Sequence, residues 1–143
     1  EMVAAGADPA SVSREVFQNR TYASMRLEAT AIMRAEFSED GATAFGYLTR
    51  EDFARFGAQK SDAEPVIDAL RRIEGVRVAC MLREQEDCIR GSLRAKDNTD
   101  VSAIARTFGG GGHVAAAGFT LRCTLDDAVA QVRAALAEAV RAS

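Results

Sequence analysis

The sequence predicts an α/β fold in which helices pack on a mixed β-sheet. Strand and helix patterns alternate after residue 40, and the last predicted helix has apolar residues along one side. A length of 143 residues with 48% apolar side chains fits a single core. We therefore expect one α/β domain, with a further helix ahead of its sheet.

The first half of the chain is predicted to hold a helix, a strand and a second helix. Apolar residues at roughly helical spacing predict a helix over 11–35, with a break near 19–21. Aromatic and β-branched residues predict a strand at 42–49. The Ser-Asp-Ala-Glu pattern at 61–64 is typical of a capping box, so a helix should run from about 62 to 73.

The second half is predicted to contain a hairpin and two helices. The strands 76–84 and 88–96 flank a short polar turn and should pair with each other. A short helix at 100–107 leads into four consecutive glycines, and an apolar strand follows around 119–121. Thr124 then begins a final amphipathic helix.

Charge and composition exclude several classes of protein. A net charge of −3 argues against a surface that coats nucleic acid, although a local basic site is compatible with it. No apolar run approaches the roughly 20 residues of a membrane span, and no signal segment opens the chain, so we expect a soluble cytoplasmic protein. Three cysteines without a C-x-x-C motif predict reduced thiols. With His113 as its single histidine, one chain cannot build a zinc site from two imidazoles.

The strand at 88–96 has one apolar and one basic face. Period-two alternation places Arg90, Ser92, Arg94 and Lys96 on the same side. Taken alone, this pattern favours a solvent-facing edge strand, since basic residues at an edge oppose aggregation. The alternative is a row of hydrogen-bond donors for a ligand.

The glycine run at 109–112 is less ordinary, because four glycines between ordered apolar flanks lose much backbone entropy on folding. Bare backbone lets N–H groups approach a ligand and form a nest for phosphate or carboxylate. His113 follows directly and could donate to the same anion. The alternative, a flexible linker, is disfavoured because true linkers are polar on both sides.

Other residues have plainer interpretations. Arg83 and Glu84 are expected at a solvated hairpin end rather than at a pocket. Four aromatic residues could stack on a base but are expected to pack in the core: Phe45, Tyr47, Phe53 and Phe56.

Three segments of the chain resemble a known family. The stretches SLRAK (92–96), DVSAIARTFGGGGHVAAAGF (100–119) and IEGVRVACMLRE (73–84) resemble the C-terminal DHH-associated domain of DHH-family phosphoesterases, particularly the bacterial nanoRNase and pAp-phosphatase type. The resemblance implies a substrate-binding domain over 39–143. It also implies that 1–38 is the end of a catalytic DHH domain and its linker helix.

The resemblance implies roles for particular residues. Arg94 and His113 would bind a substrate phosphate or the adjoining nucleotide, and the others of the set would line that pocket: Ser92, Gly110, Gly111 and Gly112. In the family, the N-terminal domain holds two manganese ions with Asp and His ligands. This chain contains no Asp-His-His triplet. We therefore expect it to bind no metal, to be inactive alone and to depend on the missing DHH domain.

Several alternatives stay open at this point. The parent could act on short single-stranded RNA, on pAp or on a cyclic dinucleotide, and the resemblance also allows a homodimer formed through the parent. A different class is a non-catalytic nucleic-acid binding module, similar to the C-terminal domain of alanyl-tRNA synthetases.

Overall fold

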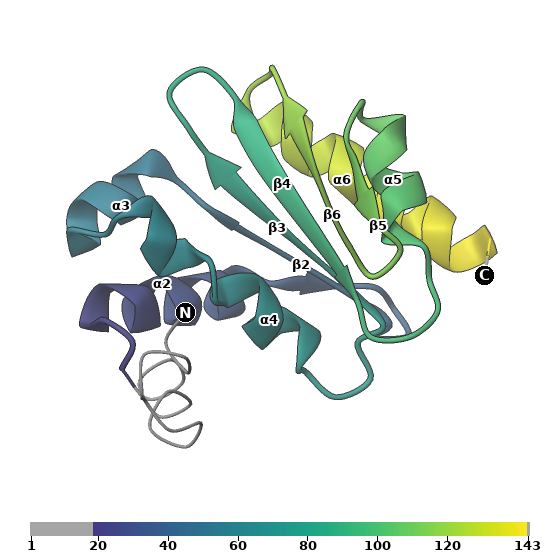
Figure 1. Cartoon of the computed structure of the whole chain (residues 1–143), viewed down its shortest axis with the longest axis horizontal. Coiled ribbons are helices and arrows are strands. Elements are labelled where there is room, and N and C mark those ends of the chain that lie inside the picture. Colours follow the sequence, from purple (N-terminus) through teal and green to yellow (C-terminus); the bar gives the residue numbers. More distant parts are fainter. Residues whose placement is uncertain (1–18, 143) are drawn as a thin grey trace, which may run out of the picture.

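A six-stranded mixed sheet runs through the centre of the protein (Figure 1), in a computed structural model that describes residues 19–142. Only β2 and β3 pair in parallel; the other neighbours are antiparallel. In sheet order, the strands are β1 (Glu36–Phe37), β2 (Thr43–Leu48), β3 (Val78–Glu84), β4 (Ile89–Ala95), β6 (Ala116–Leu121) and β5 (Gly111–His113). The predicted α/β fold with a mixed sheet is confirmed.

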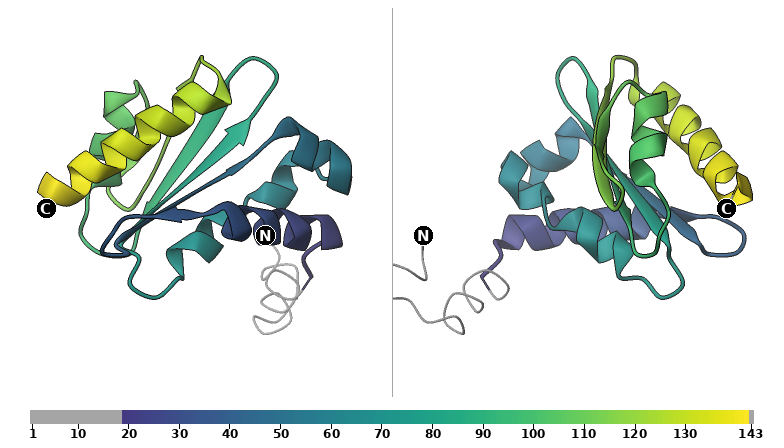
Figure 2. Two further views of the ribbon diagram at one scale, coloured as in Figure 1. Left: turned by 180° about the vertical axis from the view of Figure 1, so that it is seen from behind. Right: turned by 45° about the vertical axis from the view of Figure 1, so that its right-hand side comes forward.

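Helices cover the two faces of this sheet unequally. One face carries α2, α3 and α4, which pack mainly over β2 and β3, while α5 and α6 cover the other face (Figure 2). The bounds are α2 (Tyr22–Arg34), α3 (Arg50–Phe56), the 3-10 turn η1 (Lys60–Ala63), α4 (Val66–Arg71), α5 (Val101–Thr107) and α6 (Leu125–Ala142). Among the described residues, no helix therefore covers the first face over much of β4, β6 and β5.

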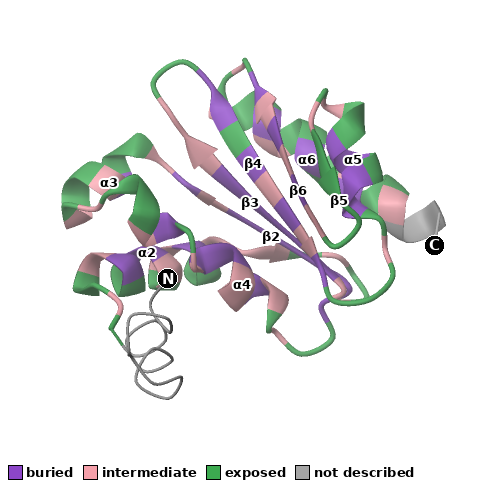
Figure 3. Ribbon diagram, in the orientation of Figure 1, coloured by how far each residue is buried: buried purple, intermediate pink, exposed green. Residues whose placement is uncertain are grey.

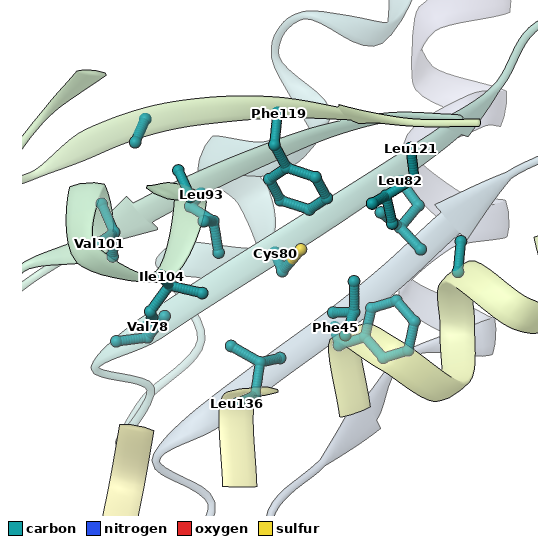
Figure 4. Packing of buried hydrophobic residues seen from close by; sticks show 14 of the residues in the cluster. Phe45, Val78, Cys80, Leu82, Leu93, Val101, Ile104, Phe119, Leu121 and Leu136 are labelled. Carbon is teal, nitrogen blue, oxygen red and sulfur yellow. The ribbon is translucent and has the colours of Figure 1, made fainter. Parts of the chain in front are cut away.

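The core under α5 and α6 is closely packed and apolar. Phe119 projects from β6 between Leu82 and Leu93, and all three are buried (Figure 4). A Cβ atom added at Gly91 would lie 2.1 Å from the Phe119 ring, so glycine is required for the ring to lie flat on β4. Burial raises the pKa of the Cys80 thiol, which makes this cysteine an unreactive core residue.

A second core lies between β2, β3 and the helices α2 and α4. Asp52 is buried at its margin, where its carboxylate accepts hydrogen bonds from Arg34 Nη1 at 2.6 Å and from the Thr49 backbone N–H at 2.7 Å. Burial alone would raise the pKa of Asp52, but the bonds from Arg34 and Thr49 outweigh it and hold this pKa below its usual value. The ion pair thus ties α2 to the start of α3.

Most of the predicted elements are present, and one was placed wrongly. The hairpin of β3 and β4, the strand β2, the helix α5 and the Thr124 cap of α6 are confirmed. The expected helix at 62–73 instead begins at Val66, after the 3-10 turn η1. Pro65 has no N–H to bond back to the chain, which prevents an α-helical turn from forming before it.

Some elements were not foreseen. The sequence prediction missed α3, although Thr49 and Asp52 form its capping box, and it missed the short strands β1 and β5. Of the helix expected over 11–35, α2 is the described part, and 11–18 lies outside the described residues. The aromatic residues do pack on the two cores: Phe45 is buried, and Tyr47, Phe53 and Phe56 are half-buried.

Candidate functional site

The residues singled out in the sequence meet on the open face of β4, β6 and β5. Arg94 is paired with Ala116 across β4 and β6, and Ala116 is paired with His113 across β6 and β5. Directly opposed residues of antiparallel strands point to the same side of a sheet. Arg94 and His113 therefore flank the small Ala116, on the face that α5 and α6 leave uncovered (Figure 1).

The next row of the same face is nearly bare. Ser92 opposes Gly118, which opposes Gly111, so one hydroxyl and two glycines form the floor beside Arg94 and His113. A Cβ atom added at Gly111 would meet nothing within 4 Å, so this position is open. In Figure 3 β5 is exposed and β4 alternates between buried and more accessible residues. A flat ligand group can thus approach the backbone here.

The cations of this face have neutral hydrogen-bond partners. Arg94 Nη1 donates to the Leu93 carbonyl at 2.9 Å, Arg90 Nη1 to Thr120 Oγ1 at 2.5 Å, and Lys96 Nζ to the Ile73 carbonyl at 3.0 Å. Within 19–142, no carboxylate forms an ion pair with any of the three. Their charge is therefore left to attract an anionic ligand.

β4 is an interior strand, which corrects the expectation of an edge. It lies between β3 and β6, and both of its hydrogen-bonding edges are occupied. Its basic residues therefore do not protect a free edge from aggregation, which removes the plain explanation for them.

The glycine run also differs from both interpretations of its sequence. Gly109, at φ +81°, and Gly110 use their N–H groups to end α5, donating to Arg106 and Ala105 carbonyls. These two N–H groups are therefore not available for a nest. The run is not a linker either, because β5 begins at Gly111.

Two of these glycines are needed for packing. A Cβ atom at Gly110 would lie 2.2 Å from the Gly118 carbonyl oxygen, and one at Gly112 would lie 2.6 Å from Ala117 Cα. Both contacts are with β6 and would force the backbone apart. The structure thus brings together Ser92, Arg94, Gly111 and His113, whereas Gly110 and Gly112 lie against β6 and keep β5 close to it.

Arg83 was missed as a member of this surface. It opposes Arg90 in the hairpin, so its side chain lies on the same face as the other cations. The signal was available in the sequence, because the two arginines are placed symmetrically about the turn at 85–88.

The residues described do not fit a manganese centre. No three His, Cys, Asp or Glu side chains between residues 19 and 142 lie close enough to hold a metal ion, and the chain has one histidine. No helix in that part of the chain is long and apolar enough to cross a membrane. The open cationic face is suited to an anionic ligand.

Comparison with known protein families identifies the family of this chain. The family model of the DHHA1 domain matches residues 43–142. The chain belongs to this family, the DHH-associated domain of DHH phosphoesterases.

Two curated relatives are similar to this chain in sequence over part of their length. The bifunctional oligoribonuclease and PAP phosphatase NrnA of Thermus thermophilus is 33% identical over 94 residues, which are 65% of this chain and 29% of the relative. The protein of the same name in Bacillus subtilis is 28% identical over 97 residues, 68% of this chain and 30% of the relative. The chain therefore spans under a third of the length of either relative.

Solved structures agree with the fold. An exopolyphosphatase-related protein from Bacteroides fragilis superposes with a TM-score of 0.86 at 28% identity, over 96% of this chain and 41% of that one. The C-Ala domain of Aquifex aeolicus alanyl-tRNA synthetase gives a TM-score of 0.50 at 17% identity, over 71% of this chain and 97% of that one. At this identity the second likeness concerns the fold alone.

Proposed function

We propose that this chain is the substrate-binding domain of a DHH-family phosphoesterase that hydrolyses short oligoribonucleotides or pAp. The observation that carries the proposal is the row Arg94–Ala116–His113, in which two hydrogen-bond donors flank a small residue on an open face. A phosphate seated over Ala116 would receive hydrogen bonds from both sides. The names of the Thermus and Bacillus relatives supply the two candidate substrates.

In this proposal the domain positions substrate and supplies no chemistry of its own. The planar guanidinium of Arg94 binds two phosphate oxygens at once, and His113 donates from the opposite side. Ser92 and Gly111 leave room for the ribose or base beside that phosphate. Holding the phosphate here would orient the bond to be cleaved.

The catalytic step belongs to a preceding DHH domain, in which manganese would be held outside residues 19–142. The parent is proposed to be cytoplasmic, which is consistent with three free cysteines. The chain alone should therefore not hydrolyse pAp when Mn²⁺ is added. Hydrolysis above a buffer control and abolished by EDTA would overturn this division of labour.

Binding measurements on this chain test the phosphate site. We expect Arg94→Ala to weaken pAp binding by about 1.5–3 kcal/mol, the free energy of a charge-assisted hydrogen bond, and His113→Ala to weaken it by a similar or smaller amount. Arg106→Ala on α5, behind the sheet, is the matched control and should bind like the wild type. Equal losses in Arg94→Ala and Arg106→Ala, measured by calorimetry, would show that only net charge matters.

The same assay separates the other classes of function. A binding module for long RNA should prefer a structured RNA to pAp or a dinucleotide, and a cyclic dinucleotide phosphodiesterase should prefer the cyclic ligand. The concentration of cations on one sheet face, within a chain of net charge −3, favours a small ligand over a long RNA.

A further inference from the structure

A second pair of cations lies on the open face, nearer the hairpin turn. Arg83 on β3 and Arg90 on β4 are directly opposed, so their side chains share one side of the sheet. Like charges in directly opposed positions destabilise a sheet. The repulsion between the two arginines thus destabilises the fold. Such a pair is expected where the charges serve to bind a ligand.

The surroundings of Arg83 strengthen this point. Its side chain is half-buried, and within residues 19–142 it makes neither a hydrogen bond nor an ion pair. Burial lowers the pKa of its guanidinium, repulsion from Arg90 lowers it further, and attraction to Glu64 opposes both only in part. Arg90 has a neutral partner, Thr120. An anion placed between Arg83 and Arg90 would relieve this strain.

A cavity adjoins Arg83 on the side of α3. It has a volume of about 470 Å³, which is in the range of small-ligand sites. Phe53 and Ala58 give it an apolar wall, and its charged lining is balanced, with three cations and three carboxylates: Arg50, Lys60, Arg83, Glu84, Glu86 and Asp87. The aromatic wall suits the base of a nucleoside, which would stack there while its phosphate lies outside the cavity, between Arg83 and Arg90.

The distance along β4 relates this pair to the phosphate site. Arg90 and Arg94 are four residues apart on one strand, a separation of about 14 Å at about 3.4 Å per residue. Ser92 lies midway and on the same face. A ligand with one phosphate cannot reach both arginines at this separation. A stacked strand advances only about 3.4 Å for each phosphate, so two consecutive phosphates can reach both arginines only when the oligonucleotide is extended and the two long side chains lean toward each other.

We propose that Arg83 and Arg90, with the cavity beside α3, form a second subsite that takes the next phosphate and nucleoside of an oligonucleotide whose terminal phosphate is held by Arg94 and His113. The proposal rests on the proposed function, because the first phosphate fixes the position of the chain. It adds a preference for ligands of two or more nucleotides. Arg83 is then a specificity residue that acts only on the longer ligand.

The test compares two ligands in EDTA, AMP and the 5′-phosphorylated dinucleotide pApA, by calorimetry on this chain. The wild type should bind pApA more tightly than AMP. Arg83→Gln should reduce that preference by about tenfold, the equivalent of one charge-assisted contact, and leave AMP binding within about twofold of wild type. The salt dependence of pApA binding should become shallower, by about 0.7 in the slope of log K against log salt.

Controls separate this proposal from the proposed function. Arg94→Gln should weaken AMP and pApA together, and Arg106→Gln, with the same change of charge, should weaken neither. The melting temperature of Arg83→Gln should equal or exceed that of the wild type, since a repulsion is removed. A lowered melting temperature would mean that Arg83 supports the fold instead.

The outcomes are distinct. An unchanged pApA-to-AMP ratio in Arg83→Gln, with Arg94→Gln still defective, would overturn the second subsite alone. If Arg94→Gln binds both ligands normally, or the wild type binds neither, the phosphate site itself is wrong.

Discussion

The two faces of β4 show how one strand serves both stability and binding. Toward α5 and α6 it presents Ile89 and Leu93, both buried, and a glycine covered by Phe119. Toward the opposite face it presents Arg90 and Arg94, which are without carboxylate partners in the described part of the chain. The apolar packing of the strand thus lies on one face, and the other face is free to carry charges that are not neutralised within the described part of the chain.

In the part of that second face that helices cover, the buried charge is paired. Over β2 the buried Asp52 is paired with Arg34, because an unpaired charge there would be costly. Over β4 the arginines remain unneutralised. Paired charge therefore marks the structural part of the face, and unpaired charge marks the part that we assign to a ligand.

The strongest test of this comparison removes the ring that covers β4. Phe119→Ala should lower the free energy of unfolding by about 3–5 kcal/mol, since it empties a fully buried site. Thr120→Ala, the next residue but on the open face, should lower it by no more than about 1 kcal/mol. Urea unfolding followed by circular dichroism measures both. Similar losses would mean that the open face contributes to stability as much as the covered one.

The next test breaks the paired charge. Asp52→Asn should lower the free energy of unfolding at neutral pH by about 2–3 kcal/mol, because Arg34 loses its charged partner and the Thr49 N–H loses the carboxylate that caps α3. Asp68→Asn, which breaks the more solvent-accessible ion pair with Arg71, should cost less than about 0.5 kcal/mol.

The pH dependence of that effect has a definite sign. The pKa of Asp52 is lower in the folded state than in the unfolded chain, so its stabilisation is complete above the ordinary aspartate pKa of about 3.9. The stabilisation is lost as pH falls through the lower, folded value. The difference between wild type and Asp52→Asn should therefore shrink below about pH 4, and a difference that stays constant into acid would contradict the ion-pair account.

The smallest effects on stability, and the sharpest contrast, come from neighbouring glycines. Gly112→Ala should destabilise the protein by about 1–3 kcal/mol, because its Cβ would overlap Ala117. Gly111→Ala should change stability by less than about 0.5 kcal/mol, since its Cβ enters open space, yet it should weaken pAp binding by covering the floor of the site. Thermal melts and calorimetry read the two effects separately. Wild-type binding by Gly111→Ala would exclude close approach of ligand at this point.

Local patterns predicted much of the fold. Alternation in β4, the symmetric hairpin and the Thr124 cap each depend on residues close in sequence. The errors arose where one residue changed the outcome, as Pro65 did within the expected helix. The interior place of β4 could not be predicted, because it depends on β6 pairing with it from 22 or more residues away.

The candidate site was predicted in part for the same reason. Ser92 and Arg94 lie on one face by strand alternation alone, whereas the position of His113 depends on its register with Ala116. The glycines were singled out correctly as unusual, but for two of them the cause is a clash with β6, which only tertiary structure reveals. Arg83 was overlooked because a charged residue at a hairpin end is ordinarily solvated.

The two sides of the proposed phosphate site differ in how firmly the fold holds them. Arg94 lies on a seven-residue strand bonded on both edges, while His113 ends a three-residue strand paired with β6 alone. Short edge segments open locally at far lower free energy than the core does. We therefore expect β4 to stay folded while β5 opens locally, so that bound phosphate slows amide hydrogen exchange in β5 much more than in β4. Release of the phosphate would then require only the fraying of the three residues of β5, and the hydrophobic core beneath the sheet would stay intact.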